Sequence, residues 1–237
     1  MPELLATDFY YLRNFEFVLD WVDARYADLL SADEHAFVRA FTAQPEASRA
    51  LLVRLIMRKG DHFRASRLAY EEVGDIERAA QPLLEQGWLV TDQAIEIDTL
   101  ARLLLKGELA GLDLGISQAS KLGKQALLEA IIAQGPNSRP WSEWPGIPSD
   151  VLYSLTISPL CERLRLLFFG NLAQDWSEFV LAELGVQQYE QVPFCTESRS
   201  FHRAADVDDY IYLGRCRDQL EAGVDVAEVL ALCADFA

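Results

Sequence analysis

The chain of 237 residues carries 37 acidic side chains against 21 Lys and Arg, which gives a formal net charge of −16. Hydrophobic residues make up 51% and charged residues 24%, the balance of a globular rather than a disordered protein. The apolar runs are shorter than the ~20 residues that span a bilayer, and the first residues lack the pattern of a signal peptide. We therefore expect a cytoplasmic protein with no membrane partner, whose overall charge disfavours indiscriminate binding of nucleic acid.

The beginning of the chain has the pattern of three helices. Apolar residues recur at helical spacing over residues 9–30. Ser31 is followed by Glu34, a capping-box signature for a second helix that runs to about residue 41. A third helix follows Pro45 and ends in a cluster of basic residues.

A fourth helix and two short strands come next. Asp75 can cap a helix over residues 76–86. Residues 63–70 and 88–91 have the composition of strands. Helices combined with a small hairpin predict a mainly α chain that starts with a winged-helix-like domain over residues 1–96. A plain helical bundle is the alternative.

Five basic residues form a positive exception in this acidic chain: Arg54, Arg58, Lys59, Arg64 and Arg67. Clustered Lys and Arg on one element are the electrostatic signature of phosphate binding. Such a patch acts on a polyanion over about a Debye length, ~8–10 Å, even when the net charge is negative. We expect all five to contact nucleic-acid phosphates, although Arg54 lies between Leu51 and Leu55 and could pair with an acidic residue instead. The alternative for the cluster is a solvated helix end.

Residues 97–135 have the pattern of two short helices joined by a turn. Spaced leucines supply an apolar face for the first helix, and a second apolar cluster follows residue 123. Lys121 and Lys124 lie at the entry to the second helix, where a helix N-terminus favours phosphate. The arrangement resembles a SAP motif, a small helical hairpin that contacts duplex DNA. We therefore expect these two lysines to bind DNA as well.

The remainder of the chain is predicted to be a linker followed by more helices. Residues 136–150 contain four prolines, which is typical of a linker. Residues 151–237 return to helical patterns, and Leu184–Gly185 with Tyr189 resembles the spacing of tetratricopeptide-like repeats. We expect the start of an incomplete tetratricopeptide-like helical region, with unrelated helices in one bundle as the alternative.

No familiar catalytic or metal-binding motif is evident in the sequence. It contains no phosphate-binding loop, no nucleophile elbow and no zinc-binding H-E-x-x-H motif. The four cysteines are widely spread, as expected for reduced, buried residues rather than for a metal site. Cys195 and His202 could form a thiol–base pair, but a packing cysteine and a surface histidine are the simpler interpretation.

A metal-dependent nuclease core of the PD-(D/E)xK type is also not expected in this chain. Such cores need an acidic residue two positions before a lysine, because the acid holds the metal and the lysine positions the phosphate or nucleophile. The residues two positions before the four lysines are Met57, Leu104, Ala119 and Leu122. The sequence therefore predicts no catalytic and no metal-binding residue in this chain.

Several short segments resemble the Fanconi-anaemia-associated nuclease family, the VRR-NUC structure-specific DNA nucleases, in a bacterial-type homologue. The residues that carry the likeness are Tyr10–Arg13, Val53–Lys59, Arg67–Glu72 and Gly87–Leu89. The likeness covers nearly the whole chain, closely up to about Leu89 and loosely after Gly135.

This resemblance implies a fold, an activity and partners. Family members join a winged-helix-like domain, a SAP domain, a tetratricopeptide-like region and a VRR-NUC nuclease domain. This chain would be the N-terminal, DNA-binding portion of an enzyme that incises 5′ flaps and branched DNA in interstrand cross-link repair. The nuclease domain, with Mg²⁺ or Mn²⁺, would lie in a further part of the same protein or on a separate chain. The enzyme would act at the bacterial nucleoid, or in the nucleus of a eukaryote.

One residue departs from the family pattern, and two other functions remain open. Glu108 lies where SAP hairpins often carry a basic residue, which puts DNA contact by that helix in doubt. The first alternative function is a non-enzymatic DNA-binding regulator built on a winged helix. The second is a helical protein-interaction module that binds no nucleic acid.

Overall fold

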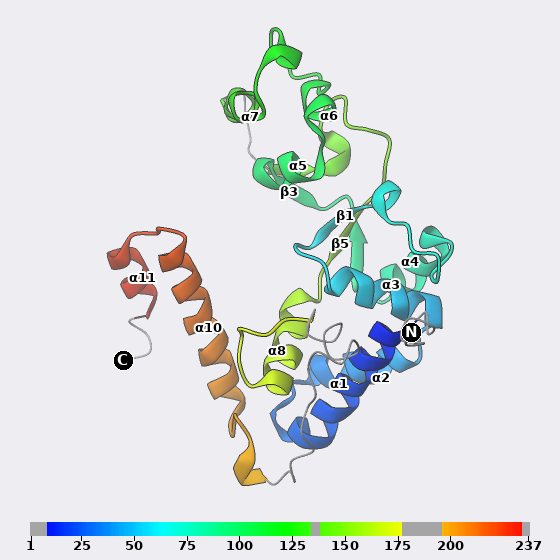
Figure 1. Ribbon diagram of the computed structural model, residues 1–237, viewed down its shortest axis with the longest axis vertical. Coiled ribbons are helices and arrows are strands. Elements are labelled where there is room, and N and C mark those ends of the chain that lie inside the picture. Colours follow the sequence, from blue (N-terminus) through cyan, green and yellow to red (C-terminus); the bar gives the residue numbers. More distant parts are fainter. Residues whose placement is uncertain (1–8, 134–137, 177–195, 234–237) are drawn as a thin grey trace, which may run out of the picture. The chain divides into compact units, whose positions relative to one another are not determined.

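The computed structural model describes residues 9–133, 138–176 and 196–233 (Figure 1). By compactness the chain divides into two units, the first made of residues 1–44 and 158–237 and the second of residues 45–157. Taken over both units, most described residues lie in helices, as the sequence predicts. Among the helices of the described parts, none is long and apolar enough to cross a membrane.

The described part of the first unit is built from helices. They are α1 (Tyr10–Tyr26), η1 (Ala27–Leu29), α2 (Ala32–Thr42), α8 (Ser158–Phe169), η5 (Thr196–Ser198), α10 (Ala204–Glu221) and α11 (Val226–Cys233). Helix α1 packs against α8, and α10 packs against both α8 and α11. The fully buried ring of Phe15 on α1 contacts the rings of Phe41 and Trp176. An aromatic cluster therefore forms part of the core of this unit.

A capping box and a buried ion pair fix the start of α2. The Ser31 backbone N–H donates to the Glu34 carboxylate at 2.7 Å, and the Glu34 N–H donates to Ser31 Oγ at 3.2 Å, which confirms the predicted cap. Arg163 of α8 donates to the same carboxylate at 2.7 Å and also pairs with Asp208 of α10. Arg163 thus joins three helices that are far apart in the sequence.

The helices expected near the end of the chain are present where the structure describes them. The helical patterns expected within residues 151–237 correspond to α8, α10 and α11, whereas the helix expected from Trp176 to Leu184 lies, beyond Trp176, outside the described residues. The Leu184–Gly185 and Tyr189 motif lies outside the described residues. The tetratricopeptide-like character of this region therefore stays a prediction.

The second unit combines helices with two small sheets (Figure 1). Its helices are α3 (Glu46–Ile56), α4 (Ile76–Glu85), α5 (Ile97–Leu103), α6 (Lys106–Ala110) and α7 (Lys124–Ile132), with short turns η2 (Ala65–Arg67), η3 (Ala119–Lys121) and η4 (Trp141–Glu143). Its strands are β1 (His62–Arg64), β2 (Leu89–Thr91), β3 (Ala94–Glu96), β4 (Ser138–Pro140) and β5 (Leu152–Leu155). Helix α3 packs against α4, and α5 contacts both β1 and β3.

The three-stranded sheet has the order β1-β5-β2, and both pairings are antiparallel. On β5, Tyr153 pairs with Phe63 of β1 and Ser154 pairs with Val90 of β2. The predicted strands after the third and fourth helices are therefore present, but they are separated by a central strand from much later in the chain. The first of them is also shorter than the expected 63–70, because the chain turns into η2 after Arg64.

The segment expected to be a linker, residues 136–150, contains regular structure and buried side chains in its described part. It contains β4, which pairs with β3, and the η4 turn. Trp141 and Trp144 are 3% and 2% exposed, and they pack in a cluster with leucines of α5, α6 and α7. The expectation of a linker was wrong. It rested on the four prolines, whereas two buried tryptophan side chains pack this segment against the helices of the hairpin.

The compact units also differ from the boundaries expected at 1–96, 97–135, 136–150 and 151–237. Helices α1 and α2 belong to the first unit together with α8, α10 and α11, whereas the elements from α3 to β5 belong to the second. The SAP-like hairpin lies between β2 and β5 in the sequence, so it is an insertion between two paired strands. Its connection to the sheet therefore runs through both ends of the hairpin.

Candidate nucleic-acid interface

The five clustered basic residues all lie in the second unit, but they differ in exposure. Arg58 and Lys59 are exposed in the turn after α3, and Arg67 is exposed at the end of η2. Arg54, on α3, is half-buried, and Arg64, at the end of β1, is buried. Only three of the five side chains are therefore placed to meet a ligand from solvent.

Arg54 lies between the buried residues Leu51 and Leu55 and pairs with an acidic residue, which was the alternative considered for it from the sequence. Its Nε and Nη2 atoms donate to Glu72 Oε1 at 2.8 and 2.6 Å. Its guanidinium also lies 5.2 Å from the centre of the Tyr70 ring. The pairing connects α3 to the loop before α4 and reduces the charge that Arg54 offers to a phosphate.

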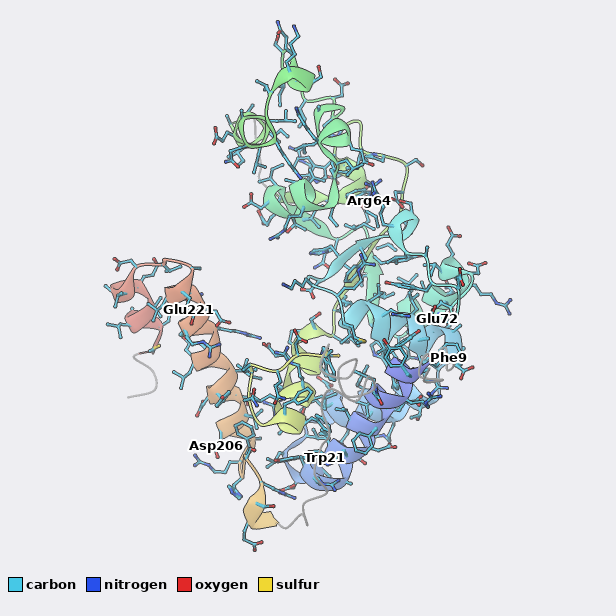
Figure 2. All side chains as sticks on the ribbon, in the orientation of Figure 1. Phe9, Trp21, Arg64, Glu72, Asp206 and Glu221 are labelled. Atoms are coloured by element: carbon cyan, nitrogen blue, oxygen red, sulfur yellow. The ribbon has the colours of Figure 1, made fainter. Side chains whose placement is uncertain are left out.

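Arg64, which is labelled in Figure 2, is buried and forms ion pairs with two carboxylates. Nε donates to Asp150 at 2.8 Å, and Nη1 donates to both Glu108 oxygens at 2.8 Å. The Arg64 side chain is only 5% exposed and that of Asp150 only 4%. Its Nε and Nη1 atoms are therefore engaged within this ion-pair network, and direct contact of Arg64 with DNA stays a prediction.

The network also explains why an acidic residue stands at position 108. Glu108 accepts from Arg64 on the β1 side and from the Leu105 backbone N–H at the start of α6. A basic residue there would face the buried guanidinium of Arg64. Glu108 therefore connects the SAP-like hairpin to the sheet.

The two carboxylates of the network are held in the charged form. Burial alone would raise the pKa of Asp150, but hydrogen bonds from Ser66 and Arg64 outweigh burial and lower it below its usual value. Burial would likewise raise the pKa of Glu108, but the Leu105 N–H and Arg64 together lower it. The negative charges that hold Arg64 are thus present near neutral pH.

A pocket of about 410 Å³ opens beside this network. Arg58, His62, Arg67 and Arg102 line it together with Arg64, and its apolar wall includes Phe63 and Leu104. Arg102, exposed on α5, was not among the residues expected to bind DNA. The sequence holds no signal for it, because it is an isolated arginine that the fold brings next to Arg58 and Arg67.

Lys121 and Lys124 are exposed at the entry to α7, as the SAP-like pattern predicts. Lys124 Nζ lies 3.5 Å from the Leu104 carbonyl oxygen, a long contact that leaves the ammonium accessible to solvent. Their role in DNA binding stays a prediction.

The described residues hold no group of three or more His, Cys, Asp or Glu side chains that could hold a metal ion. His62 Nδ1 lies 2.8 Å from Ser154 Oγ, and burial lowers the pKa of its imidazole. Cys195 of the possible thiol–base pair lies outside the described residues. Within the described part of the chain, the acidic and histidine side chains therefore form no cluster that fits Mg²⁺ or Mn²⁺.

Two family models match consecutive parts of the chain. Residues 9–90 match "FAN1, HTH domain", and residues 94–144 match "Fanconi anemia-associated nuclease SAP domain". The chain is 48% identical to the Fanconi-associated nuclease 1 homolog of Pseudomonas aeruginosa, over 96% of this chain and 41% of that protein. It is 29% identical to the Arabidopsis thaliana homolog, over 76% of this chain and 21% of that protein.

Solved structures match over the same extent. A crystal structure of paFAN1 bound to 5′ flap DNA with a 2-nt flap and a gap has a TM-score of 0.87 and 48% identity, covering 96% of this chain and 42% of that one. A second complex, with a 1-nt flap, has a TM-score of 0.86. The chain thus contains helix-turn-helix and SAP segments of this family and spans about two-fifths of the Pseudomonas relative and about one-fifth of the Arabidopsis one. It belongs to the Fanconi-anaemia-associated nuclease family.

Proposed function

We propose that this chain is the DNA-binding part of a structure-specific nuclease that acts on 5′ flaps and similar branched DNA. One observation carries the proposal: the chain matches, at 48% identity over 96% of its length, a protein whose crystal structures contain 5′ flap DNA. The likeness includes the second unit, where exposed basic residues gather in an otherwise acidic chain. Such a local surface can bind a polyanion despite the net charge.

The exposed residues Arg58, Lys59, Arg67, Lys121 and Lys124 contact backbone phosphates in this proposal. Phosphate contacts fix the position of a protein on duplex DNA without reading the base sequence. This suits a protein that recognises the branching of DNA rather than a particular site. Arg54 and Arg64 support the surface from within, through Glu72, Glu108 and Asp150.

Cleavage would be carried out by a nuclease portion on the same protein or on a separate chain. Mg²⁺ or Mn²⁺ bound there would stabilise the attacking and leaving oxygens of the phosphodiester. The whole enzyme would serve interstrand cross-link repair, at the bacterial nucleoid or, in a eukaryote, in the nucleus. This chain would supply binding and orientation only.

Binding and cleavage assays on the purified chain test the proposal. We expect tighter binding to a labelled 5′ flap than to a linear duplex of the same length, and no cleavage with Mg²⁺ or Mn²⁺. Equal affinity for the two DNAs would favour the non-enzymatic regulator. No binding even at low salt would favour the protein-interaction module. Metal-dependent cleavage by the pure chain would contradict the proposal that this chain binds DNA and a separate nuclease portion cleaves it.

A further inference from the structure

The pocket beside Arg64 receives cationic side chains from both parts of the second unit. Arg58 comes from the turn after α3, and Arg67 comes from η2, which directly follows β1. Arg102 comes from α5, which belongs to the segment that matches the SAP model. A single group in this pocket could therefore contact the helix-turn-helix part and the SAP part at the same time.

The local charges favour an anion. Arg58 donates to the Tyr70 hydroxyl at 3.0 Å and Arg102 to the Thr99 hydroxyl at 3.0 Å, so these bonds orient the guanidiniums without neutralising them. Arg67 lies 3.7 Å from Glu108, whose carboxylate is already taken up by Arg64 at 2.8 Å. Asp150 is also held by Arg64, so both carboxylates of the network are engaged within it, whereas Asp61, next to His62, is a further acidic residue near the pocket.

The volume of the pocket and the residues that line it indicate which class of anion it can bind. Its volume of about 410 Å³ lies within the range of ~300–1,000 Å³ that is typical of small-ligand sites. Guanidinium groups match the geometry of phosphate oxygens through paired N–H donors. The apolar wall of Phe63 and Leu104 lowers the local dielectric, which strengthens such contacts, and it can also pack against a sugar ring.

We propose that this pocket is a phosphate subsite that binds one backbone phosphate of DNA between Arg58, Arg67 and Arg102. The inference rests on the proposed function and adds to it a residue, Arg102, and a task for that residue. One phosphate held from both parts fixes the position of the SAP-like hairpin relative to the β1-β5-β2 sheet. The Arg64 network holds the two sides of the pocket at the distance that this requires.

The experiment compares Arg102→Gln with the parent chain in binding 5′ flap DNA over a range of salt concentrations. Loss of one charged hydrogen-bonded contact should weaken binding roughly tenfold and should reduce the slope of log K against log salt by about 0.9. Arg78→Gln on α4 is the matched control, because Arg78 is also an exposed arginine of the second unit and lies outside the pocket. It should change binding less than twofold.

His62 provides a second readout inside the pocket. Burial and the nearby Arg102 lower its pKa, whereas Asp61 acts in the opposite direction. A bound phosphate should raise that pKa, and NMR can follow the imidazole because the chain has only three histidines. The rise should occur with DNA in the parent and disappear in Arg102→Gln.

The outcomes separate this inference from the function on which it rests. If the parent binds flap DNA but Arg102→Gln binds equally well, with the same salt slope, the phosphate subsite is contradicted and the proposed function stands. If pyrophosphate shifts His62 but DNA does not, the pocket takes a free phosphate compound, and the inference of a backbone phosphate is likewise contradicted. If the parent binds no DNA even at low salt, the proposed function fails as well.

Discussion

At the scale of single residues, the second unit uses its arginines in two ways. Arg64 is buried and neutralised by carboxylates from α6 and from the loop before β5. Arg58 and Arg102 are exposed and bound to neutral hydroxyls. A buried ion pair positions parts of a fold, whereas an exposed guanidinium keeps the charge with which to bind a phosphate. The two kinds should therefore respond differently to substitution.

Arg64→Ala should destabilise the protein strongly. Removing the guanidinium leaves Asp150 buried without its main partner, and breaking a buried pair in this way costs about 3 kcal/mol. Urea unfolding followed by tryptophan fluorescence measures the loss, since Trp141 lies 5.8 Å from the Arg64 guanidinium. Arg58→Ala is the control and should stay within about 0.5 kcal/mol of the parent. Equal stability of the two variants would show that the network does not support the fold.

The same network should make stability depend on acid pH. The pKa values of Asp150 and Glu108 are lowered in the folded state from ordinary values of 3.8 and 4.5. As the pH falls, the unfolded chain therefore takes up protons first, so the stabilisation is complete above these ordinary values and is lost below them. Asp150→Asn should flatten the fall in urea midpoint below about pH 5, whereas the exposed control Glu71→Gln should not. An unchanged acid profile in Asp150→Asn would contradict this.

At the scale of elements, the SAP-like hairpin is connected to the sheet at both ends and by side chains. It lies between β2 and β5, and its Glu108 binds the arginine that ends β1. Helix α7 offers Lys121 and Lys124 at its entry, where the helix dipole also favours an anion. DNA contact by the hairpin should therefore come from the start of α7 and from Arg102, rather than from α6.

Lys121→Glu combined with Lys124→Glu should weaken binding to the duplex arms of a flap DNA by about tenfold or more. Each substitution removes a cation and places a like charge near the phosphates. Fluorescence anisotropy at fixed salt measures the effect, and a thermal unfolding curve checks that the variant is folded. A dissociation constant equal to that of the parent would show that the hairpin contributes no phosphate contact at α7.

Local signals in the sequence predicted where the helices begin and end, but not which distant segments pair with one another. Ser31 with Glu34 and Asp75 before α4 mark helix starts that the structure confirms. No short-range signal indicates β5, because its pairing partners lie far earlier in the chain. The cluster at α3 correctly located a basic surface, but the carboxylates that bury Arg64 are 44 and 86 positions away. Arg102 was missed because only the fold brings it next to Arg58 and Arg67, which lie far from it in the sequence.

At the scale of the whole molecule, the chain separates a general negative charge from a local positive one. A net charge of −16 repels DNA from most of the surface. The exposed residues Arg58, Lys59 and Arg67 lie together in the second unit, near Arg102. Binding should therefore depend on very few side chains, and substitution of two of them should be decisive.

The most direct test is the salt dependence of 5′ flap binding by Arg58→Glu combined with Lys59→Glu. Arg215→Glu with Arg217→Glu, on exposed positions of α10, carries the same change in net charge and serves as the control. Between about 50 and 200 mM salt, the first variant should bind more weakly than the parent and lose about two units of slope, whereas the control should keep the parent slope. If the first variant keeps the affinity and slope of the parent, the basic surface of the second unit does not bind DNA.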